Sequence, residues 1–249
     1  MGLEDGAARR RFHSMVGRSF SISELRSKHM GMLNRMIHGV ARTLTTLGIR
    51  RDAHPDGNSL LESFLIRCRA LDAPRVLELG TSRSIASRST RHDTWVPHAS
   101  EYLGTDFASG LDVDIVADVH RLTAVTGEDQ FDVIISCSTF EHFKYPHRAA
   151  HEVMKALRVG GVLFVQTHQS FPLHAHPHDY FRFSREALAG LFGAQMGFRV
   201  LATDYEFPVK LCSLRVPSLI GQQSFLNVRL FGEKIGSTPQ TYIYEDDTA

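Results

Sequence analysis

The chain has 249 residues, of which 43% are hydrophobic and 22% charged, and its formal net charge is +1. Because the charges nearly balance, the composition gives no case for a nucleic acid or a membrane surface as a partner. The length suits one α/β domain with an extension. Cys68, Cys137 and Cys212 stand far apart, which favours reduced thiols and a cytoplasmic location over a disulfide framework.

Two helices are predicted ahead of the first strand. Residues 21–24, Ser-Ile-Ser-Glu, are typical of a capping box, and apolar residues between Leu25 and Leu47 then recur at helical spacing. Ser59 begins a second helix, which ends before Pro74. The methionine-rich face of the first helix could bind a partner, but burial against the main domain is the simpler interpretation.

The chain is organised around a short apolar run, Arg75 to Leu79, that is followed by Gly80. This composition is typical of a strand buried on both faces of a parallel sheet. Glycine allows a sharp turn at the carboxyl end of the strand, where open α/β sheets bind their ligands. A second strand ends at Asp106, 26 residues after Gly80. This spacing is close to the roughly 20 residues that separate a glycine turn from a ribose-binding acid in nucleotide-binding units.

Strands and helices alternate along the rest of the chain, which predicts a doubly wound, mostly parallel sheet of seven strands. Residues 81–100 hold few large apolar side chains, so a short helix and then an irregular loop are expected there. Residues 208–223 are long for a hairpin and are expected to reach a binding pocket or an oligomer contact. The other strands are expected at residues 112–118, 131–136, 162–165, 198–207 and 225–231, and helices at residues 146–157, ended by Gly160-Gly161, and after Ser184.

Glu78 and Gly80 resemble the first motif of class I S-adenosylmethionine (SAM)-dependent methyltransferases, in which an acid and several glycines follow the first strand. Ser82 and Ser84 replace the second and third glycines of that motif. The resemblance covers roughly residues 75–233 and implies a Rossmann-like fold. Residues 1–72 would form an arm and helices that cover the site, residues 73–236 the SAM-binding domain and residues 237–249 a loose tail.

The resemblance also implies SAM as the cofactor, bound across the carboxyl ends of neighbouring strands. Asp106 would accept both ribose hydroxyls, and Asp118 the adenine amino group, with Val119 packed on the ring. The cofactor-binding residues expected on this basis are Glu78, Gly80, Thr81, Ser82, Asp106, Phe107, Asp118, Val119 and Ser136.

Histidines are unusually frequent after the third predicted strand. His142 follows Glu141 just past the fourth strand. Residues 167–183, called the histidine loop below, resemble a methyltransferase subgroup with a Pro-His-Asp-Tyr-aromatic-Arg-Phe signature, here starting at Pro177. An imidazole that titrates near pH 6.5 suits a general base. His142 and His178 are therefore the two expected catalytic residues, and the acceptor-binding residues expected are His174, His176, Tyr180 and Arg182.

Two interpretations of the histidine loop remain open. His174, His176 and His178 alternate along the chain and could bind a metal together with Asp179. A rigid lid in which Asp179 pairs with Arg182 is the preferred interpretation, and no metal ion is predicted.

The sequence predicts that the protein is a biosynthetic transferase. It would move a methyl group from SAM to a hydroxyl or other heteroatom of a small-molecule, sugar or natural-product acceptor. A catalytically silent SAM-fold scaffold and a metal-dependent enzyme are the alternatives. The expected partner is the small-molecule or glycan acceptor, with a homodimer possible and with neither nucleic acid nor membrane involved.

Overall fold

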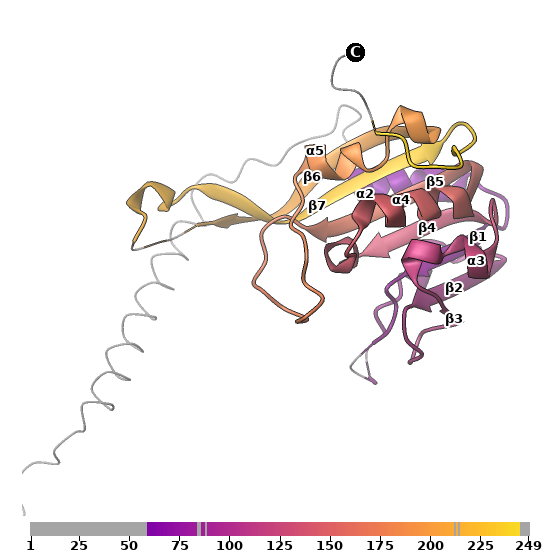
Figure 1. The fold of residues 1–249 in the computed structure, drawn as a ribbon, viewed down its shortest axis with the longest axis horizontal. Helices are drawn as coiled ribbons and strands as arrows, with labels where there is room; N and C mark the ends of the chain where they lie inside the picture. Colours follow the sequence, from indigo (N-terminus) through magenta and orange to yellow (C-terminus); the bar gives the residue numbers. More distant parts are fainter. Residues whose placement is uncertain (1–58, 84–85, 88, 212, 214, 245–249) are drawn as a thin grey trace, which may run out of the picture. The chain divides into compact units, whose positions relative to one another are not determined.

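The computed structural model describes residues 59–83, 86–87, 89–211, 213 and 215–244 (Figure 1). All of them belong to one compact unit, Arg50–Ala249. The helix expected between Leu25 and Leu47 lies outside the described residues, and so does Ser84 of the glycine motif.

A single sheet of seven strands forms the centre of the unit, in the order β3-β2-β1-β4-β5-β7-β6 (Figure 1). Strand β7 runs antiparallel to β5 and β6, and the other neighbouring strands are parallel. The prediction of a mostly parallel, seven-stranded α/β sheet is confirmed. The strands are β1 (Arg75–Leu79), β2 (Glu101–Asp106), β3 (Ile115–Val116), β4 (Phe131–Cys137), β5 (Leu157–His168), β6 (Phe198–Lys210) and β7 (Gln223–Lys234).

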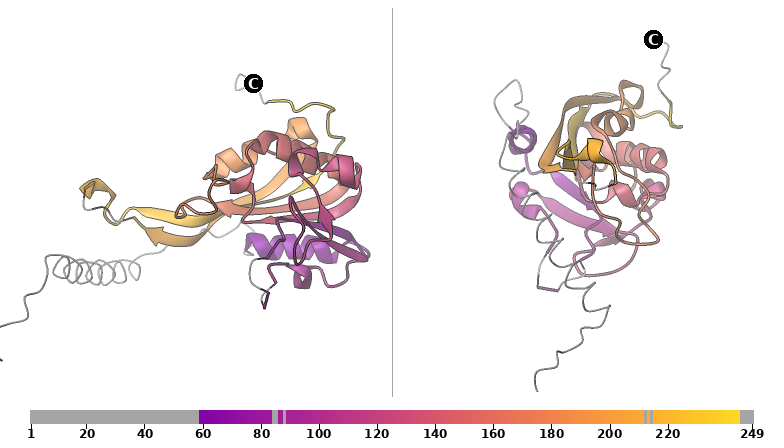
Figure 2. Two further views of the ribbon diagram at one scale, coloured as in Figure 1. Left: turned by 60° about the horizontal axis from the view of Figure 1, so that its bottom comes forward. Right: turned by 90° about the vertical axis from the view of Figure 1, so that its left-hand side faces the viewer.

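Helices cover both faces of the sheet, with α2 on one face and α4 and α5 on the other (Figure 2). None of the helices in the described part of the chain has the length and apolar character that a membrane crossing requires. The α-helices are α2 (Leu60–Arg69), α3 (Thr123–Thr126), α4 (Pro146–Ala156) and α5 (Arg185–Gly190). Short 3-10 turns are η1 (Asp93–Trp95), η2 (Val119–Arg121), η3 (Phe140–His142), η4 (Ala194–Met196) and η5 (Pro217–Leu219).

The helix starts follow from capping residues in the sequence. The Ser59 hydroxyl accepts a hydrogen bond from the Glu62 N–H at 3.2 Å, and the Ser184 hydroxyl accepts one from the Ala187 N–H at 3.1 Å. Each bond satisfies a backbone donor that the first turn of a helix leaves unpaired. Pro146 occupies the first turn of α4, where its missing N–H costs no helical hydrogen bond.

Burial on both faces explains the continuous apolar composition of the central strand β4. Val133, Ile134 and Ile135 are completely buried. Ile134 packs with the cluster under α4 and α5, whereas Val133 and Ile135 pack with the cluster under α2. On the α2 side, Phe64 lies against Phe164 with ring centroids 5.1 Å apart. The alternation of side chains along a strand thus divides one apolar run between two core layers.

The connection between β1 and β2 differs from the prediction. Its described residues contain no α-helix, only the 3-10 turn η1. Polar contacts hold the segment instead: the Arg91 guanidinium donates to the Tyr102 carbonyl at 2.6 Å and to the Asp114 carboxylate at 2.9 Å. A segment with few apolar side chains cannot bury a helical face, so it is fixed by hydrogen bonds to the neighbouring strands.

Two element boundaries also differ from the prediction. Strand β3 pairs over Ile115–Val116 only, because the Asp114 carboxylate accepts from the Gly104 N–H and Asp118 caps η2. Helix α4 ends at Ala156, four residues before Gly160, and the chain enters β5 directly at Leu157.

In the β6–β7 hairpin, the two strands pair further than predicted and take up the two ends of residues 208–223, which were predicted to be a connecting segment. The pairing continues through Pro208 with Phe225 and Lys210 with Gln223, so only residues 211–222 join the strands. Figures 1 and 2 show this hairpin extending beyond the rest of the sheet. The hairpin end exposes apolar side chains of Val216, Leu219 and Ile220.

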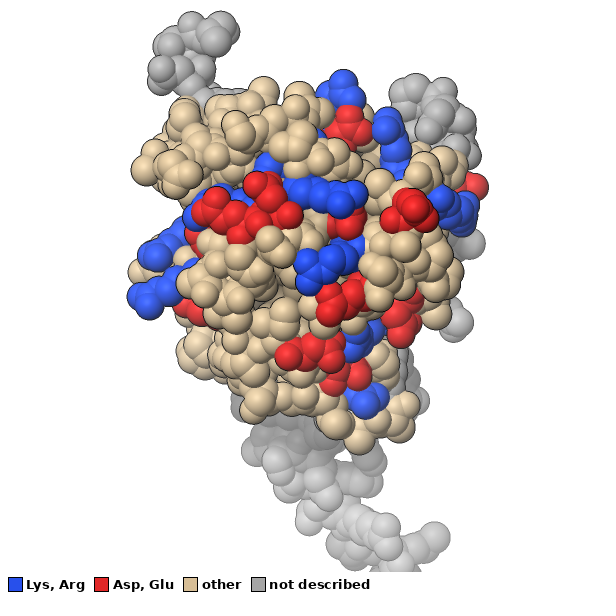
Figure 3. Space-filling view, turned by 90° about the vertical axis from the view of Figure 1, so that its right-hand side faces the viewer, with Lys and Arg blue, Asp and Glu red and all other residues tan. Residues whose placement is uncertain are grey.

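Acidic and basic side chains are interleaved on the face drawn in Figure 3. Ion pairs between exposed side chains in the described structure include Arg75–Glu101 at 2.8 Å, with both partners more than 40% exposed. Such pairs contribute at most about 1 kcal/mol each, because water screens them. The mixed charges therefore give this face no large field of a single sign.

Lys234 is a buried cation that joins the end of β7 to the α4–β5 junction. Its side chain is 2% exposed, and its ammonium donates to the carbonyls of Met154 and Leu157 and to the Asp129 carboxylate. The three N–H donors of the ammonium each have an acceptor, so the buried Lys234 side chain has its hydrogen-bonding capacity filled.

We predict that Lys234→Met lowers the free energy of unfolding by about 1–3 kcal/mol, because it removes the Lys234 donor from the Leu157 carbonyl and leaves the Met154 carbonyl only the Thr238 hydroxyl. Urea denaturation followed by circular dichroism measures the change. Arg69→Met is the matched control, since Arg69 is exposed on α2 and should change stability little. Equal stability of the Lys234 variant and the control would show that the buried Lys234 contacts do not stabilise the fold.

Candidate functional site

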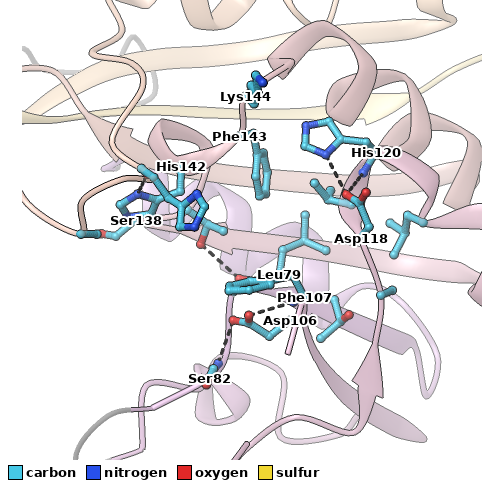
Figure 4. A pocket seen from close by; sticks show the side chains of 18 of the residues that line it. Leu79, Ser82, Asp106, Phe107, Asp118, His120, Ser138, His142, Phe143 and Lys144 are labelled. Atoms are coloured by element: carbon cyan, nitrogen blue, oxygen red, sulfur yellow. Dashed lines mark hydrogen bonds and ion pairs between the residues drawn. The ribbon is translucent and has the colours of Figure 1, made fainter. Parts of the chain in front are cut away.

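A cavity of about 630 Å³ opens at the carboxyl ends of β1, β2 and β4 (Figure 4). This is the edge at which open α/β sheets bind ligands. Its lining comes from the strand ends, from η2 and η3, and from the histidine loop. The lining residues are Leu79, Gly80, Ser82, Thr105, Asp106, Phe107, Ala117, Asp118, Val119, His120, Leu122, Ser138, Thr139, His142, Phe143, Lys144, Ala175, His178 and Tyr180.

The structure brings nine of the residues predicted from the sequence together in this cavity and leaves six outside its lining. The nine are Gly80, Ser82, Asp106, Phe107, Asp118, Val119, His142, His178 and Tyr180. The six are Glu78, Thr81, Ser136, His174, His176 and Arg182.

Gly80 makes the turn that forms one wall of the cavity. Its φ is +74°, and a Cβ at this position would lie 2.3 Å from the Thr139 hydroxyl oxygen. Both the backbone conformation and the lack of space therefore require glycine. The Gly80 N–H donates to the Thr105 carbonyl at 2.8 Å, which ties the end of β1 to β2.

The Asp106 carboxylate lies at the end of β2, directly beside this turn (Figure 4). It accepts hydrogen bonds from the Ser82 N–H at 3.2 Å and from the Phe107 N–H at 2.8 Å, one on each oxygen. A carboxylate has about four acceptor positions, so these two bonds fix its orientation and leave capacity for ligand hydroxyls. Phe107 is 75% exposed, and its ring centroid lies 6.2 Å from that of His178 across the cavity mouth.

A second carboxylate, that of Asp118, enters the cavity from η2. It accepts from the His120 N–H at 3.0 Å and lies 2.7 Å from His120 Nδ1. Although partial burial raises the pKa of Asp118, the hydrogen bonds from His120 outweigh it and hold that pKa below its usual range. The Tyr145 N–H donates to His120 Nε2 at 3.3 Å, so the ring proton lies on Nδ1 and points to Asp118.

Glu78 does not line the cavity, because it points to the opposite face of the sheet. Side chains alternate along β1, so Leu79 faces the cavity while Glu78 lies on the α2 side. There it is 2% exposed and accepts from the Tyr102 hydroxyl at 2.5 Å and from the His92 N–H at 2.9 Å. Burial, and then the Glu78 charge, raise the pKa of Tyr102. Glu78 thus anchors the loop that follows the glycine turn.

Thr81 and Ser136 lie behind the cavity wall. The Thr81 hydroxyl donates to the Asp112 carbonyl at 2.7 Å, and its side chain is buried. Ser136 is fully buried within β4. Neither residue reaches the cavity lining.

Within the histidine loop, Arg182 binds Asp179 with two parallel hydrogen bonds of 2.6 and 3.0 Å. This is the pairing that the rigid-lid interpretation predicted. Asp179 also accepts from the His174 N–H at 3.0 Å. The Arg182 guanidinium, followed by the His174 N–H, holds the pKa of Asp179 well below its usual range. Arg182 further donates to the carbonyls of Phe171 and Pro172, so its donors serve the loop itself.

Backbone hydrogen bonds attach the histidine loop to η3. The Tyr180 and Phe181 N–H groups donate to the Glu141 carbonyl at 2.9 and 3.1 Å. His142 Nδ1 lies 2.6 Å from the His178 carbonyl oxygen. A carbonyl only accepts, so the His142 ring proton is on Nδ1 and the lone pair is on Nε2. His178 is exposed, with Nδ1 3.3 Å from the Tyr180 hydroxyl.

The Glu141 side chain lies beneath this loop and is completely buried. It accepts from the Thr167 hydroxyl at 2.7 Å, and His168 Nδ1 lies 2.9 Å from its other oxygen. Burial raises the pKa of Glu141, but His168 and Thr167 outweigh burial and hold it below its usual value. His142 Nε2 is 3.8 Å from the same carboxylate, although adjacent residues usually point apart. The 3-10 turn η3 accounts for this approach.

The structure forms a different cluster from the one that the metal interpretation expected. Candidate ligand atoms of Glu141, His142 and His174 all lie within 4.8 Å of one another. Among the described residues, His176 and His178 are not part of this group.

Several lining residues were missed in the sequence. His120 follows Asp118 by two positions, a spacing typical of an aspartate that caps a turn and could have indicated the pair. Ser138 has a φ of +51°, and such strained non-glycine positions concentrate at functional sites, but no sequence pattern announces it. Phe143 and Lys144 directly follow His142 and form the upper wall (Figure 4).

The profile of a family described as a methyltransferase domain matches residues 87–165. This segment runs from the loop after β1 to β5, about a third of the chain, and contains Asp106, Asp118 and His142. The search of curated proteins found no match.

Solved structures of methyltransferases align with this chain at low identity and with TM-scores below 0.5. A Burkholderia thailandensis 1,6-didemethyltoxoflavin-N1-methyltransferase with bound 1,6-didemethyltoxoflavin and S-adenosylhomocysteine is 12% identical, with a TM-score of 0.48 over 89% of this chain and 94% of that one. A SAM-dependent methyltransferase from Mesorhizobium loti is 17% identical, with a TM-score of 0.46 over 72% and 99%. One from Archaeoglobus fulgidus is 13% identical, with a TM-score of 0.48 over 70% and 94%.

The seven-stranded sheet, the cavity at its carboxyl edge and the matched methyltransferase domain define the class of this protein. It is an enzyme of the SAM-dependent methyltransferase class, and its cofactor is SAM. This assignment replaces the alternative of a catalytically silent SAM-fold scaffold that was considered from the sequence.

We predict that Gly80→Ala weakens SAM binding at least about tenfold, because the new Cβ would push the turn away from Thr139 and shift the neighbouring Asp106. Isothermal titration calorimetry with SAM measures the change. Gly190→Ala is the control, since a Cβ there meets nothing within 4 Å. SAM affinity in Gly80→Ala equal to that of the control would show that the turn does not shape the site.

Proposed function

We propose that this methyltransferase transfers the SAM methyl group to a hydroxyl of a small-molecule, sugar or natural-product acceptor. The observation that carries the proposal is the arrangement of one cavity, lined on one side by the carboxylates of Asp106 and Asp118 and at its mouth by the exposed ring of His178. Its volume of about 630 Å³ is in the range of small-ligand sites.

The cofactor is proposed to lie along the strand ends from β1 to η2. Asp106, oriented by the Ser82 and Phe107 N–H groups, accepts the two ribose hydroxyls. Asp118, oriented by His120, accepts from the adenine amino group, and Val119 packs on the ring. Both carboxylates are held by backbone donors, so their positions are set before the ligand enters.

The acceptor is proposed to enter beside the histidine loop, between Phe107, His178 and Tyr180. All three are exposed and line the cavity. Arg182, His174 and His176, which the sequence suggested as acceptor ligands, lie outside the lining and are not part of this proposal.

The chemical step needs alignment and one proton acceptor. The acceptor oxygen attacks the SAM methyl carbon, the carbon–sulfur bond breaks, and its electrons return to the sulfur, which leaves as the neutral thioether of S-adenosylhomocysteine. The hydroxyl proton passes to the His178 ring and from there to water, since this ring is exposed. His142 is proposed to position His178, because its Nδ1–H donates to the His178 carbonyl.

The cytoplasmic location and the homodimer stay predictions.

The experiment that tests the cofactor half of the proposal is calorimetric titration of the full chain with SAM and with S-adenosylhomocysteine. One site per chain for both ligands is expected. A panel of hydroxyl-bearing acceptors with radiolabelled SAM then tests the transfer. Methylation confined to amine or carbon acceptors would replace the hydroxyl assignment.

We predict that Asp106→Ala weakens SAM binding at least about tenfold, since two ribose hydroxyls lose their acceptor at a cost of roughly 1–3 kcal/mol. Asp118→Ala should have a smaller effect, because Val119 still packs on the adenine. Asp72→Ala is the control, because Asp72 is exposed, precedes the amino end of β1 and does not line the cavity. A folded Asp106 variant with unchanged affinity would place the ribose elsewhere.

We predict that His178→Ala lowers kcat by roughly 10²–10⁴-fold and leaves SAM affinity within a few-fold, as expected when a general base is removed. The matched control is His176→Ala, the same change on the same loop at a residue outside the cavity lining. Single-turnover measurements with saturating SAM isolate the chemical step. An equal loss of activity in both variants would indicate that the loop, and not the His178 ring, is what matters.

A further inference from the structure

The cluster of Glu141, His142 and His174 joins the body of the domain to the histidine loop. Glu141 and His142 belong to η3 after β4, whereas His174 belongs to the loop. Their candidate ligand atoms lie within 4.8 Å of one another, and His142 Nε2 is 3.8 Å from Glu141 Oε1. The three side chains therefore converge on one point from two segments of the chain.

Glu141 Oε1 is a fully buried acceptor without a hydrogen-bond donor among the described residues. His168 Nδ1 lies 2.9 Å from it as an ion-pair contact, but the two atoms are not aligned as a hydrogen bond. Burying a carboxylate oxygen without a hydrogen-bond donor is costly, and a positive charge close to that oxygen offsets the cost. The other oxygen is satisfied by the Thr167 hydroxyl, which leaves Oε1 directed at the cluster.

Hydrogen bonds of the two imidazoles leave their Nε2 lone pairs available to a ligand. His142 Nδ1 lies 2.6 Å from the His178 carbonyl, and His174 Nδ1 lies 3.1 Å from the Pro172 carbonyl. Since carbonyls only accept, both Nδ1 atoms carry the proton. Histidines that bind metals donate their second N–H to carbonyls or carboxylates in the same way.

The geometry and the donor set suit a transition-metal ion. In a tetrahedral zinc site the ligand atoms stand roughly 3.3–3.5 Å apart, given metal–ligand distances of about 2.0–2.2 Å. The 3.8 Å between His142 Nε2 and Glu141 Oε1 is already close to this value. The His174 ligand atom lies within 4.8 Å of the other two, so it must approach by up to about 1.5 Å, which the partly exposed His174 ring can do by rotation. Two imidazoles and one carboxylate favour zinc and its neighbours over magnesium or calcium.

We propose that Glu141, His142 and His174 form a binding site for a divalent transition-metal ion of the zinc type, which fastens the histidine loop to η3. This site differs from the His174, His176, His178 set that the sequence suggested. The proposal does not rest on the hydroxyl acceptor or on the role of His178. A bound ion would bridge the two segments that line the cavity mouth and would hold the loop closed.

The test uses the untagged full chain after dialysis against a chelator, without SAM. Calorimetric titration with Zn²⁺ should give one site per chain, and Co²⁺ should give the visible absorption of a tetrahedral ion. Glu141→Gln and His174→Ala should each weaken Zn²⁺ binding by roughly a hundredfold or more, because each removes one of three ligands. His176→Ala keeps the loop and lies outside the cluster, so it should bind as the wild type does.

A second readout follows the loop itself. Zn²⁺ should slow hydrogen exchange at the Tyr180 and Phe181 amides, which bond the Glu141 carbonyl, in the wild type and in His176→Ala but not in His174→Ala. His174→Ala removes a partly exposed ring and should fold normally, so a negative result cannot be attributed to unfolding. No binding of Zn²⁺, Co²⁺ or Ni²⁺, or binding that survives both ligand variants, would overturn the proposal.

Discussion

The left-handed turn at Gly80 is the constraint on which the rest of the site depends. The chain leaves β1 against Thr139, and a single added carbon would lie 2.3 Å from the Thr139 hydroxyl oxygen. Because the turn is this tight, the next backbone N–H groups lie at the end of β2: that of Ser82 reaches the Asp106 carboxylate. A backbone requirement at one residue thus positions an acidic side chain that comes from another strand.

Glu141 has a comparable role on the other side of the cavity. Its carbonyl accepts the Tyr180 and Phe181 N–H groups, so the histidine loop rests on η3 through main-chain bonds that do not depend on side-chain identity. Its carboxylate lies buried beneath the same loop beside Thr167. The histidine loop is therefore attached at its base, while Asp179 and Arg182 fix its shape internally. The cavity has one wall formed by strand ends and one formed by an ordered loop.

The strands and their carboxyl ends could be predicted from the sequence, because burial on both faces demands continuous apolar runs such as that of β4. What failed were features decided by distant contacts. Glu78 was placed in the cofactor site, yet strand alternation turns it to Tyr102 on the opposite face. Strands β6 and β7 were predicted to stop short of residues 208–223, because the length over which two strands pair is set by register, which composition does not reveal. The approach of His174 to Glu141 depends on the folding of the whole loop.

The serine at position 82 marks a departure from the glycine motif, and the structure explains why it is compatible with this fold. Ser82 is not among the non-glycine residues with a positive φ, and its side chain is exposed. The position contributes its N–H to Asp106, which any residue except proline can supply. Glycine is required two residues earlier, at Gly80, where backbone conformation and lack of space both exclude a side chain. The departure therefore falls where the backbone makes the contact and the side chain has room, so it does not argue against cofactor binding.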